Sequence, residues 1–406
     1  MAGSSSSSSS STNSTSGPGA YRAAGVDIEA QERGLAQVKK LARATFTPGV
    51  LSEIGGFGGL FRPDLAGLAE PVLVASADGV GTKLAVARMA RDYSTVGRDL
   101  VNHCVNDILV QGALPLFFLD YVGAGVLEPE RMVELVAGVA RGCRENGCAL
   151  LGGETAEMPG FYQPGDYELV GFIVGLVDRP RLLDGSRVAA GSVLVGLPSA
   201  GLHTNGYSLA RRILFDRLGL GIADAAPWLR EGREGKAATK KVPTVGEELL
   251  APHLSYLGPL RSLLGSPALR GMAHITGGGL TDNLPRILPP GHRAEIRVGA
   301  WEVPAIFHFL AEQGSVGVEE MLRVFNLGIG MVLAIDPAAL RDVLATLRAA
   351  GQRSFVIGTV QEGGSGVVYD LGGEGGDAAR LFDGHEPASG APAAGRAGGT
   401  PAEEQD

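Results

Sequence analysis

Cysteine is scarce in this 406-residue chain, which contains three copies, Cys104, Cys143 and Cys148. An odd and sparse set does not form a disulfide framework, and Cys143 and Cys148 lack the spacing of metal ligands. We therefore expect these two side chains to be buried as small apolar groups. Such a chain suits a reducing compartment, and we expect it in the cytoplasm.

Long apolar runs and an excess of positive charge are also absent. No segment approaches the roughly 18 residues that a membrane-spanning helix requires. Lys and Arg number 35 against 44 Asp and Glu, so the formal net charge is −9. Because an acidic protein is repelled by nucleic-acid phosphates and anionic lipids, we expect neither nucleic acid nor a membrane as a partner.

The two ends of the chain differ from its middle in composition. Residues 1–20 are rich in Ser and carry no charged side chain, and residues 363–406 are rich in Gly, Ala and Pro. Neither composition can bury a hydrophobic core, so we expect two disordered tails. The first also lacks the apolar core of a signal peptide and the arginines of a transit peptide.

The middle of the chain alternates strand-like and helix-like segments. Apolar residues at i, i+3 and i+4 predict a helix over 128–147, with Pro129 in its first turn and Gly147 at its end. Apolar runs predict strands at 115–121 and 169–177. This alternation indicates the α/β (α+β) class.

A cluster of turn residues between Val177 and Gly191 predicts a domain boundary. Two domains also agree with a guide of about 150 residues per domain. We place the N-terminal domain at residues 21–185 and a second mixed α/β domain at residues 186–362.

The segment PVLVASADGVGTK (71–83) is the most informative for function. An apolar strand ends at Asp78, and a carboxylate there can hold a hard cation such as Mg²⁺. Glycines let backbone N–H groups approach an anion, while a hydroxyl and an ammonium add donors. The residues that follow Asp78 and have these properties are Gly79, Gly81, Thr82 and Lys83. The segment indicates a metal–nucleotide site without Walker A spacing, and a plain strand–turn is the alternative.

A polar face is expected on the helix predicted over residues 96–113. At 100° per residue, this face carries Asp99, His103, Asn106 and Asp107. Asp107 could supply a second cation ligand opposite Asp78, since Mg²⁺ needs few carboxylates when phosphates and water complete its shell. The alternative is an ordinary solvated face.

Glycine-rich segments predict further contacts. The loop made of Gly55, Gly56, Phe57, Gly58 and Gly59 is either a flexible linker or a mobile lid over phosphates. In GGETAEMPG (152–160), acids again follow a glycine turn. Glu154, with Thr155 beside it, is a candidate for metal, ribose or substrate contact, or else an exposed turn residue.

Two later segments could hold a phosphate. In GLHTNGYSLARR (201–212), Asn205 is expected to cap a helix whose first N–H groups, with Thr204 and Ser208, bind an anion. His203 is either a loop histidine bonded to backbone or a group that acts on substrate. In HITGGG, Thr276, Gly277 and Gly278 precede a predicted helix and form another candidate anion site.

Taken in this order, the segments resemble the phosphoribosylformylglycinamidine cyclo-ligase family, also called aminoimidazole ribonucleotide synthetase. The matching segments are YRAAGVDIEA, GGFGGLF, DGVGTK, VNDILVQGA, PLFFLDY, GGETAEMPG, HTNGYSLAR, HITGGG and FNLGIGM. They extend over residues 21–362, and the pairing of GGETAEMPG with DGVGTK is highly specific. The departures are Leu202, where the family often has Pro, and Thr204, where Ser is common.

The resemblance implies a purine-biosynthesis ligase that consumes ATP. Its substrate is formylglycinamidine ribonucleotide, whose formyl oxygen is phosphorylated before the substrate's own amino nitrogen closes the imidazole ring. It further implies a homodimer in which the N-terminal sheets pair into a shared barrel, with ATP in a cleft bounded by both domains.

The resemblance also suggests roles for the candidate residues. Asp78 and Asp107 would hold Mg²⁺ on ATP, assisted by Asp99 or Asn106. Lys83 and Thr82 would contact phosphate, and the loop 55–61 would close over the nucleotide and exclude water. The ribonucleotide would lie near Thr204–Ser208, with His203 as a general-acid or electrophilic helper.

Related families are the main alternatives. Selenophosphate synthetase-like proteins place a reactive Cys or selenocysteine near the N-terminal glycine-rich region, whereas this chain has no cysteine before Cys104. Thiamine-monophosphate kinase-like proteins share the acidic clusters without GGETAEMPG and HTNGYSLAR. A non-catalytic nucleotide-binding protein of the same fold would be expected to lack Asp78, Asp107 or the glycines, and all are present.

Overall fold

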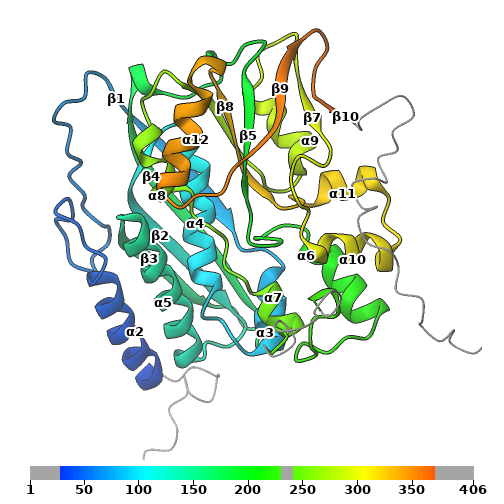
Figure 1. Cartoon of the computed structure of the whole chain (residues 1–406). Coiled ribbons are helices and arrows are strands. Elements are labelled where there is room, and N and C mark those ends of the chain that lie inside the picture. Colours follow the sequence, from blue (N-terminus) through cyan, green and yellow to red (C-terminus); the bar gives the residue numbers. More distant parts are fainter. Residues whose placement is uncertain (1–27, 230–240, 371–406) are drawn as a thin grey trace, which may run out of the picture.

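The structure, a computed structural model, describes residues 28–229 and 241–370 (Figure 1). The predicted tail at residues 1–20 lies outside the described residues, as does the part of the C-terminal tail from residue 371. The predicted start of this tail at Gly363 is too early, because Val367–Asp370 form strand β10 alongside β7 (His292–Arg297). Parallel pairing to a neighbouring strand orders this short segment despite its glycine-rich surroundings.

The N-terminal half contains a four-stranded sheet in the order β1-β4-β2-β3. Its strands are β1 (Pro71–Gly79), β2 (Leu114–Ala124), β3 (Ala149–Glu157) and β4 (Tyr167–Asp178). β4 pairs antiparallel with β1 and β2, while β2 and β3 are parallel because helix α5 (Pro129–Asn146) connects them. The three strands predicted in this half, at 115–121, at 169–177 and before Asp78, are confirmed.

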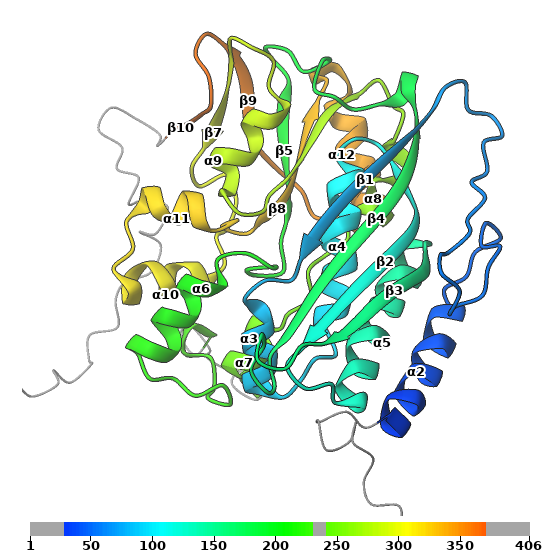
Figure 2. The ribbon, with the colours of Figure 1, turned by 180° about the vertical axis from the view of Figure 1, so that it is seen from behind.

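Helices cover one face of this sheet. They are α2 (Ile28–Arg43), α4 (Val96–Leu109) and α5 (Pro129–Asn146), while α3 (Lys83–Ala90) packs against α4. α5 confirms the predicted helix, and Gly147 ends it in the left-handed conformation at φ 71°. The predicted apolar stripe of α4, Leu100, Cys104 and Ile108, is fully buried. Figure 2 shows the strands on the near side and α4 and α5 behind them.

Two glycines let α4 and α5 pack closely. A Cβ on Gly97 would lie 2.2 Å from the Leu135 carbonyl oxygen and 2.6 Å from the Val139 nitrogen. Because both are helix backbone atoms, Gly97→Ala must push the helices apart, and we expect a loss of about 1–3 kcal/mol in the free energy of unfolding. Thermal unfolding measures the change.

The matched control for this substitution is Gly258→Ala. Gly258 lies in α8 (Leu257–Leu260), and nothing lies within 4 Å of its added Cβ. A helical Gly-to-Ala change without a clash is neutral or stabilises by up to ~1 kcal/mol. Equal melting temperatures for the two variants would contradict the close-packing argument.

The C-terminal half contains a six-stranded sheet in the order β10-β7-β9-β5-β8-β6. Before β10, its strands are β5 (Val193–Pro198), β6 (Leu269–His274), β7 (His292–Arg297), β8 (Ile329–Ile335) and β9 (Phe355–Glu362). β8 is buried along its whole length, as expected for an interior strand with both faces covered. The sheet therefore forms the core of the second half.

Short helices complete the second half, some beside its sheet and some at the junction with the first half (Figure 1). They are α6 (Tyr207–Arg211), α7 (Val245–Leu249), α8, α9 (Gly279–Asn283), α10 (Ala305–Gly314), α11 (Val318–Val324) and α12 (Leu340–Ala349). The predicted N-cap at Asn205 is wrong, because α6 starts at Tyr207 and its N-cap position is Gly206 at φ 78°. A left-handed conformation at the cap position favours glycine. The turn therefore continues to Gly206, and the helix begins one residue later than an Asn205 cap predicts.

Residues 251–256, which connect α7 to α8, join the two halves through side chains of α4. Asn102 Nδ2 donates to the His253 carbonyl oxygen at 2.7 Å, and Asn106 Nδ2 donates to Leu254 O at 2.8 Å. Asn106 Oδ1 accepts from the Tyr256 N–H at 3.0 Å. Most of what the sequence identified as the polar face of α4 is therefore an interface between the halves.

The face of the N-terminal sheet opposite the helices is apolar and open. The side chains of Leu73 and Phe172 are 64% and 47% exposed, and Leu119 lies opposite Phe172 in the β2–β4 ladder. Among the described residues, no helix combines the length and apolar character needed to cross a membrane.

Candidate active site

The two predicted acids Asp78 and Asp107 meet at one imidazole. Asp78 stands one residue before the end of β1, and its Oδ2 lies 2.8 Å from His103 Nε2. Asp107 lies one helical turn after His103 on α4, and its Oδ2 is 3.7 Å from the same nitrogen. The strand end and the helix face thus converge as the sequence predicted.

Both acids line a cavity of about 490 Å³ between the two halves. Their side chains are 44% and 25% exposed, so both carboxylates are accessible from it. The second half contributes His274, Thr276, Asn283 and Arg286 to the wall. Two accessible carboxylates beside polar and basic groups fit Mg²⁺, which takes few protein ligands when substrate phosphates supply the rest.

Local contacts keep Asp78 ionised. Burial by itself raises the pKa of Asp78, but the hydrogen bond and charge of His103 and the N–H of Gly79 outweigh it, so the net pKa is lowered. Gly79 N donates to Asp78 Oδ1 at 2.7 Å. The carboxylate is therefore available as an anionic ligand at neutral pH.

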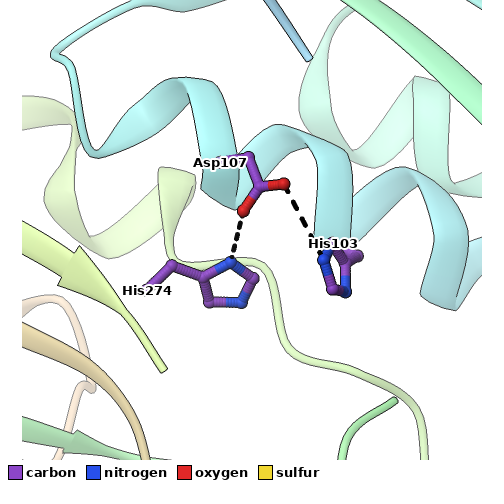
Figure 3. A group of neighbouring side chains, drawn as sticks. All are labelled: His103, Asp107 and His274. Atoms are coloured by element: carbon purple, nitrogen blue, oxygen red, sulfur yellow. Dashed lines mark hydrogen bonds and ion pairs between the residues drawn. The ribbon is translucent and has the colours of Figure 1, made fainter. Parts of the chain in front are cut away.

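Behind these acids lies a group of four buried histidines, His103, His203, His253 and His274. Thr204 Oγ1 lies 2.8 Å from His103 Nδ1 and 3.2 Å from His253 Nδ1. His253 Nε2 lies 3.1 Å from His274 Nε2. His274 Nδ1 in turn lies 2.8 Å from Asp107 Oδ1, as Figure 3 shows. Thr204, predicted to bind substrate, is 8% exposed and serves this network.

Lys83 does not face the cavity. It is fully buried at the start of α3, with Nζ 2.7 Å from Asp99 Oδ2 and 2.8 Å from the Ala251 carbonyl oxygen. The predicted contact of Lys83 with phosphate is thus not supported, because its ammonium is enclosed and already paired. Burial lowers the pKa of Lys83, and the charge of Asp99 opposes that shift.

The other two predicted helpers of the metal are also occupied. Asp99 is fully buried, with Oδ2 on Lys83 and Oδ1 accepting from the His253 N–H at 2.7 Å. The amide of Asn106 is bonded to the backbone of residues 254 and 256. Neither side chain reaches the cavity, so the structure does not support Asp99 as a metal ligand or Asn106 as a nucleotide contact.

His203 is buried rather than exposed to substrate. Its backbone is left-handed at φ 60°, and its Nε2 accepts from the Ala200 N–H at 3.0 Å. The ring stacks on His253 with centroids 4.1 Å apart. Burial lowers its pKa well below the usual value, so the ring is neutral and is a poor general acid. Of the two sequence-based interpretations, the structure favours the loop histidine bonded to backbone.

The turn after Asp78 meets the start of α6. Thr82 Oγ1 and Ser208 Oγ are hydrogen-bonded at 3.1 Å, and Gly81 adopts φ 64°. The hydroxyl of Thr82, predicted to contact ATP, and that of Ser208, predicted to contact the substrate, therefore lie together at the junction of the halves. Gly79 and Gly81 keep the backbone of this turn free of side chains.

The segment after β6 returns to the same cavity. Thr276 lines it beside His274, and Gly278 is the left-handed residue before α9 at φ 99°. An added Cβ on Gly277 would lie 3.4 Å from Asn205 Oδ1, which places the two predicted substrate segments next to each other. The structure thus brings Thr276, Gly277 and Asn205 together near the acids.

The glycine-rich loop lies elsewhere in the chain. Gly55–Gly59, including the fully exposed Phe57, line a separate cavity of about 810 Å³ with Lys39, Asp120 and Glu154. Glu154 Oε1 accepts from the Thr155 N–H, and both residues are exposed. In one copy of the chain, the loop therefore does not cover Asp78, and Glu154 and Thr155 do not adjoin the segment around Thr204.

Three polar groups near the two cavities were not expected from the sequence. His253 lies in a segment without a motif, and His274 was identified only as part of a glycine-rich turn. Asp120, in the predicted strand 115–121, was not singled out, although burial raises its pKa to about 7. The period of β2 offered a signal for Asp120, because it places this acid on the same face as the core residue Phe118.

Comparison with known families covers most of the chain. Residues 64–177 match the model described as AIR synthase related protein, N-terminal domain. Residues 189–370 match AIR synthase related protein, C-terminal domain.

Individual relatives extend this similarity. A phosphoribosylformylglycinamidine cyclo-ligase of Trichlorobacter lovleyi is 51% identical over 341 residues, which cover 84% of this chain and 94% of the relative. One from Geobacillus kaustophilus is 49% identical over 354 residues, 87% of this chain and 99% of the relative.

Solved structures share the fold at lower identity. Thiamine-monophosphate kinase from Stenotrophomonas maltophilia is 18% identical, with a TM-score of 0.57 over 82% of this chain and 96% of its own. That likeness concerns the fold alone, because an enzyme with a different reaction has it too.

Proposed function

The chain belongs to the phosphoribosylformylglycinamidine cyclo-ligase family, and from this premise we propose that the Asp78–Asp107 cavity performs the ring closure. The reaction converts formylglycinamidine ribonucleotide and ATP to aminoimidazole ribonucleotide, ADP and phosphate. The observation that carries the assignment is the convergence of two accessible carboxylates with residues of the second half in one cavity.

The reaction needs positioning and charge neutralisation more than a protein nucleophile. The formyl oxygen attacks the γ-phosphorus as its bond to ADP breaks. The amino nitrogen then attacks the formyl carbon, the carbon–oxygen bond to phosphate breaks, and the nitrogen loses a proton. Mg²⁺ would supply charge neutralisation on the phosphates, and Asp78 and Asp107 are the residues that would hold it.

The chain's own residues position the substrates. The carboxylate of Asp107 is oriented by Ser76, whose Oγ donates to Oδ2 at 3.2 Å. Thr276 and Arg286 border the acids and offer donors for the ribonucleotide phosphate, while the buried amide of Asn283 donates to the backbone carbonyls of Gly277 and Gly279 and holds this turn in place. The adjacent hydroxyls of Thr82 and Ser208 offer a second donor pair at the junction.

Each half has its own part in this proposal. We assign residues 21–185 to ATP binding, metal binding and dimerisation, and residues 186–370, which include β10, to the remainder of the substrate cavity. A cytoplasmic location agrees with free, buried cysteines and with a soluble substrate.

The test is product formation by the purified chain with authentic substrate. We expect aminoimidazole ribonucleotide to appear only when both ATP and Mg²⁺ are present. Thiamine monophosphate serves as the substrate of the rival reaction and should not be phosphorylated. If the folded chain forms no imidazole product, or phosphorylates thiamine monophosphate instead, the assignment is wrong.

A homodimer is the proposed assembly. The open face of the sheet exposes Leu73 and Phe172, and a sheet that is apolar on both faces is stable in water only when both are covered. β1 and β3 are the two edges of this sheet, and the glycine-rich loop adjoins β3. If two such sheets pair into a barrel, an edge strand of one copy of the chain lies next to an edge strand of the other copy. The glycine-rich loop can then act as a lid on the partner's site.

Substitution on this face should separate the copies. We expect the wild-type chain to have about twice the 41.8 kDa mass of one copy, and Phe172→Glu to shift it to one copy because a buried unpaired carboxylate is costly. Light scattering after size-exclusion chromatography measures the mass. Val368→Glu, at an exposed residue of β10, is the control and should remain dimeric. A wild-type monomer would refute the assembly.

A further inference from the structure

Asn106 holds the segment 251–256, which is neither helix nor strand, by bonds that a neighbouring strand would usually make. Its Nδ2 donates to Leu254 O at 2.8 Å, and its Oδ1 accepts from the Tyr256 N–H at 3.0 Å. A carbonyl can only accept and an N–H can only donate, so the orientation of the amide is determined by its two partners. Since the Asn106 side chain is fully buried and buried backbone groups need partners, this amide fastens the segment to α4.

Tyr256 extends from this segment into the second half. Its hydroxyl donates to Pro198 O at the end of β5, 2.9 Å away, and its side chain is fully buried. A Cβ on Gly330, in β8, would lie only 2.0 Å from the same hydroxyl oxygen. Glycine at this position therefore leaves the space that the Tyr256 hydroxyl occupies. The residue is thus bound to α4 at its N–H and packs against β5 and β8 at its hydroxyl.

The strand that Tyr256 meets also holds the wall of the cavity. Gly330 O accepts from the Ile275 N–H at 3.0 Å. Ile275 lies between His274 and Thr276, and both of these line the cavity between the halves. The backbone that presents the two side chains is therefore bonded to the same glycine against which the Tyr256 hydroxyl packs.

Helix α4 is therefore connected to both sides of the cavity. Asp107 lines it from the first half, with a side chain that is 25% exposed, and Figure 3 shows this carboxylate beside His274. Asn106 precedes it in the helix, where successive side chains point about 100° apart. It therefore binds the segment 251–256 while Asp107 is directed to the cavity. One turn of a rigid helix thus supports the acid and, through Tyr256, the opposite wall.

We propose that Asn106 is a positioning residue for ring closure, which acts through Tyr256 to keep the second-half wall of the cavity in place relative to Asp107. Reactions between bound groups are sensitive to such placement, because a shift of ~1 Å can lower the rate ~100-fold. Asn106 is buried and does not line the cavity, so it touches neither substrate. Its loss should then lower kcat and leave KM unchanged, whereas loss of a nucleotide contact would raise KM for ATP. The inference rests on the proposed function, because it concerns the same cavity.

The test compares Asn106→Leu with the wild type, both as full chains, in steady-state assays with ATP, Mg²⁺ and the ribonucleotide. Leucine keeps the approximate volume of the side chain and removes both bonds to the segment. We expect kcat for the imidazole product to fall at least 10-fold, with KM for each substrate within threefold of the wild-type value. A folded variant whose kcat stays within threefold of the wild type would overturn the proposal, whatever its KM for ATP.

A second readout separates positioning from a loss of stability. In the wild type, one phosphate should be released for each imidazole formed. In Asn106→Leu we expect at least two, because a displaced wall lets water attack the phosphorylated intermediate, which regenerates the formyl group and releases phosphate. A partly unfolded sample loses both products in the same proportion. A ratio of one, with a kcat loss that only matches the loss of folded protein, therefore shows that Asn106 is merely structural.

Two further variants complete the test. Val343→Ala truncates a buried side chain of α12, and we expect a lower melting temperature with unchanged kcat per folded molecule and a ratio of one. Tyr256→Phe removes only the hydroxyl bond to Pro198 O at the other end of the connection, and we expect it to fold and to lower kcat at least threefold with KM unchanged. Unchanged kcat in Tyr256→Phe overturns the proposal even if Asn106→Leu does not fold. A wild type that forms no imidazole refutes the proposed function and this inference together, whereas wild-type kinetics in Asn106→Leu refute the inference alone.

Discussion

Asp107→Asn should lower kcat for ring closure by on the order of 10²-fold or more, because it removes an anionic ligand where phosphate charge must be neutralised. The amide keeps the volume of the side chain and an oxygen for Ser76 Oγ, so the fold should be retained. Steady-state kinetics at saturating ATP and ribonucleotide, over a range of Mg²⁺ concentrations, measure the change.

The comparison for this variant is Asp342→Asn, an exposed acid in the first turn of α12. It removes the same charge away from the cavity, and its kcat should equal that of the wild type. If Asp107→Asn retains kcat within threefold with an unchanged Mg²⁺ dependence, Asp107 does not hold the metal.

Lys83→Met should cost about 3–5 kcal/mol in the free energy of unfolding, because it leaves the carboxylate of Asp99 buried and unpaired. The loss also removes the contact to Ala251 O that ties α3 to the segment 251–256. Thermal and urea unfolding without nucleotide measure this effect and separate it from any loss of ATP binding.

Two further variants sharpen this prediction. Lys83→Met with Asp99→Asn removes both charges and keeps an Oδ1 acceptor for the His253 N–H, so much of the stability should return. Arg98→Met breaks the partly exposed pair with Glu145 and should cost less than ~1 kcal/mol. If Lys83→Met lowers the free energy of unfolding no more than Arg98→Met does, the buried Lys83–Asp99 pair stabilises the fold no more than a surface ion pair.

The helices and strands that carry the site could be predicted from the sequence because their signals are local. The apolar period of residues 96–109 determines which side of α4 packs on the sheet, and it therefore predicts where Asp107 lies. The strand before Asp78 ends at a glycine turn, so this carboxylate was predictable at a strand end. Their meeting follows from packing α4 on β1.

The roles of Lys83, Asp99 and Asn106 could not be predicted in this way. Each looks like a free polar group in sequence, yet each bonds to the segment 251–256, about 150 or more residues later in the chain. A polar face on a helix has the same period whether it faces solvent or another half of the protein. Only the position of the partner segment distinguishes the two.

By itself, then, the sequence determined the family, the elements and the two acids of the cavity, because these depend on local patterns and on matching segments. The tertiary structure decided which polar groups reach the cavity. It enclosed Lys83 and His203, placed the glycine-rich loop in a separate cavity, and brought His274 to Asp107 across 167 residues of chain. Burial and hydrogen-bond partners depend on neighbours in space, and neighbours from distant segments exist only once the chain has folded.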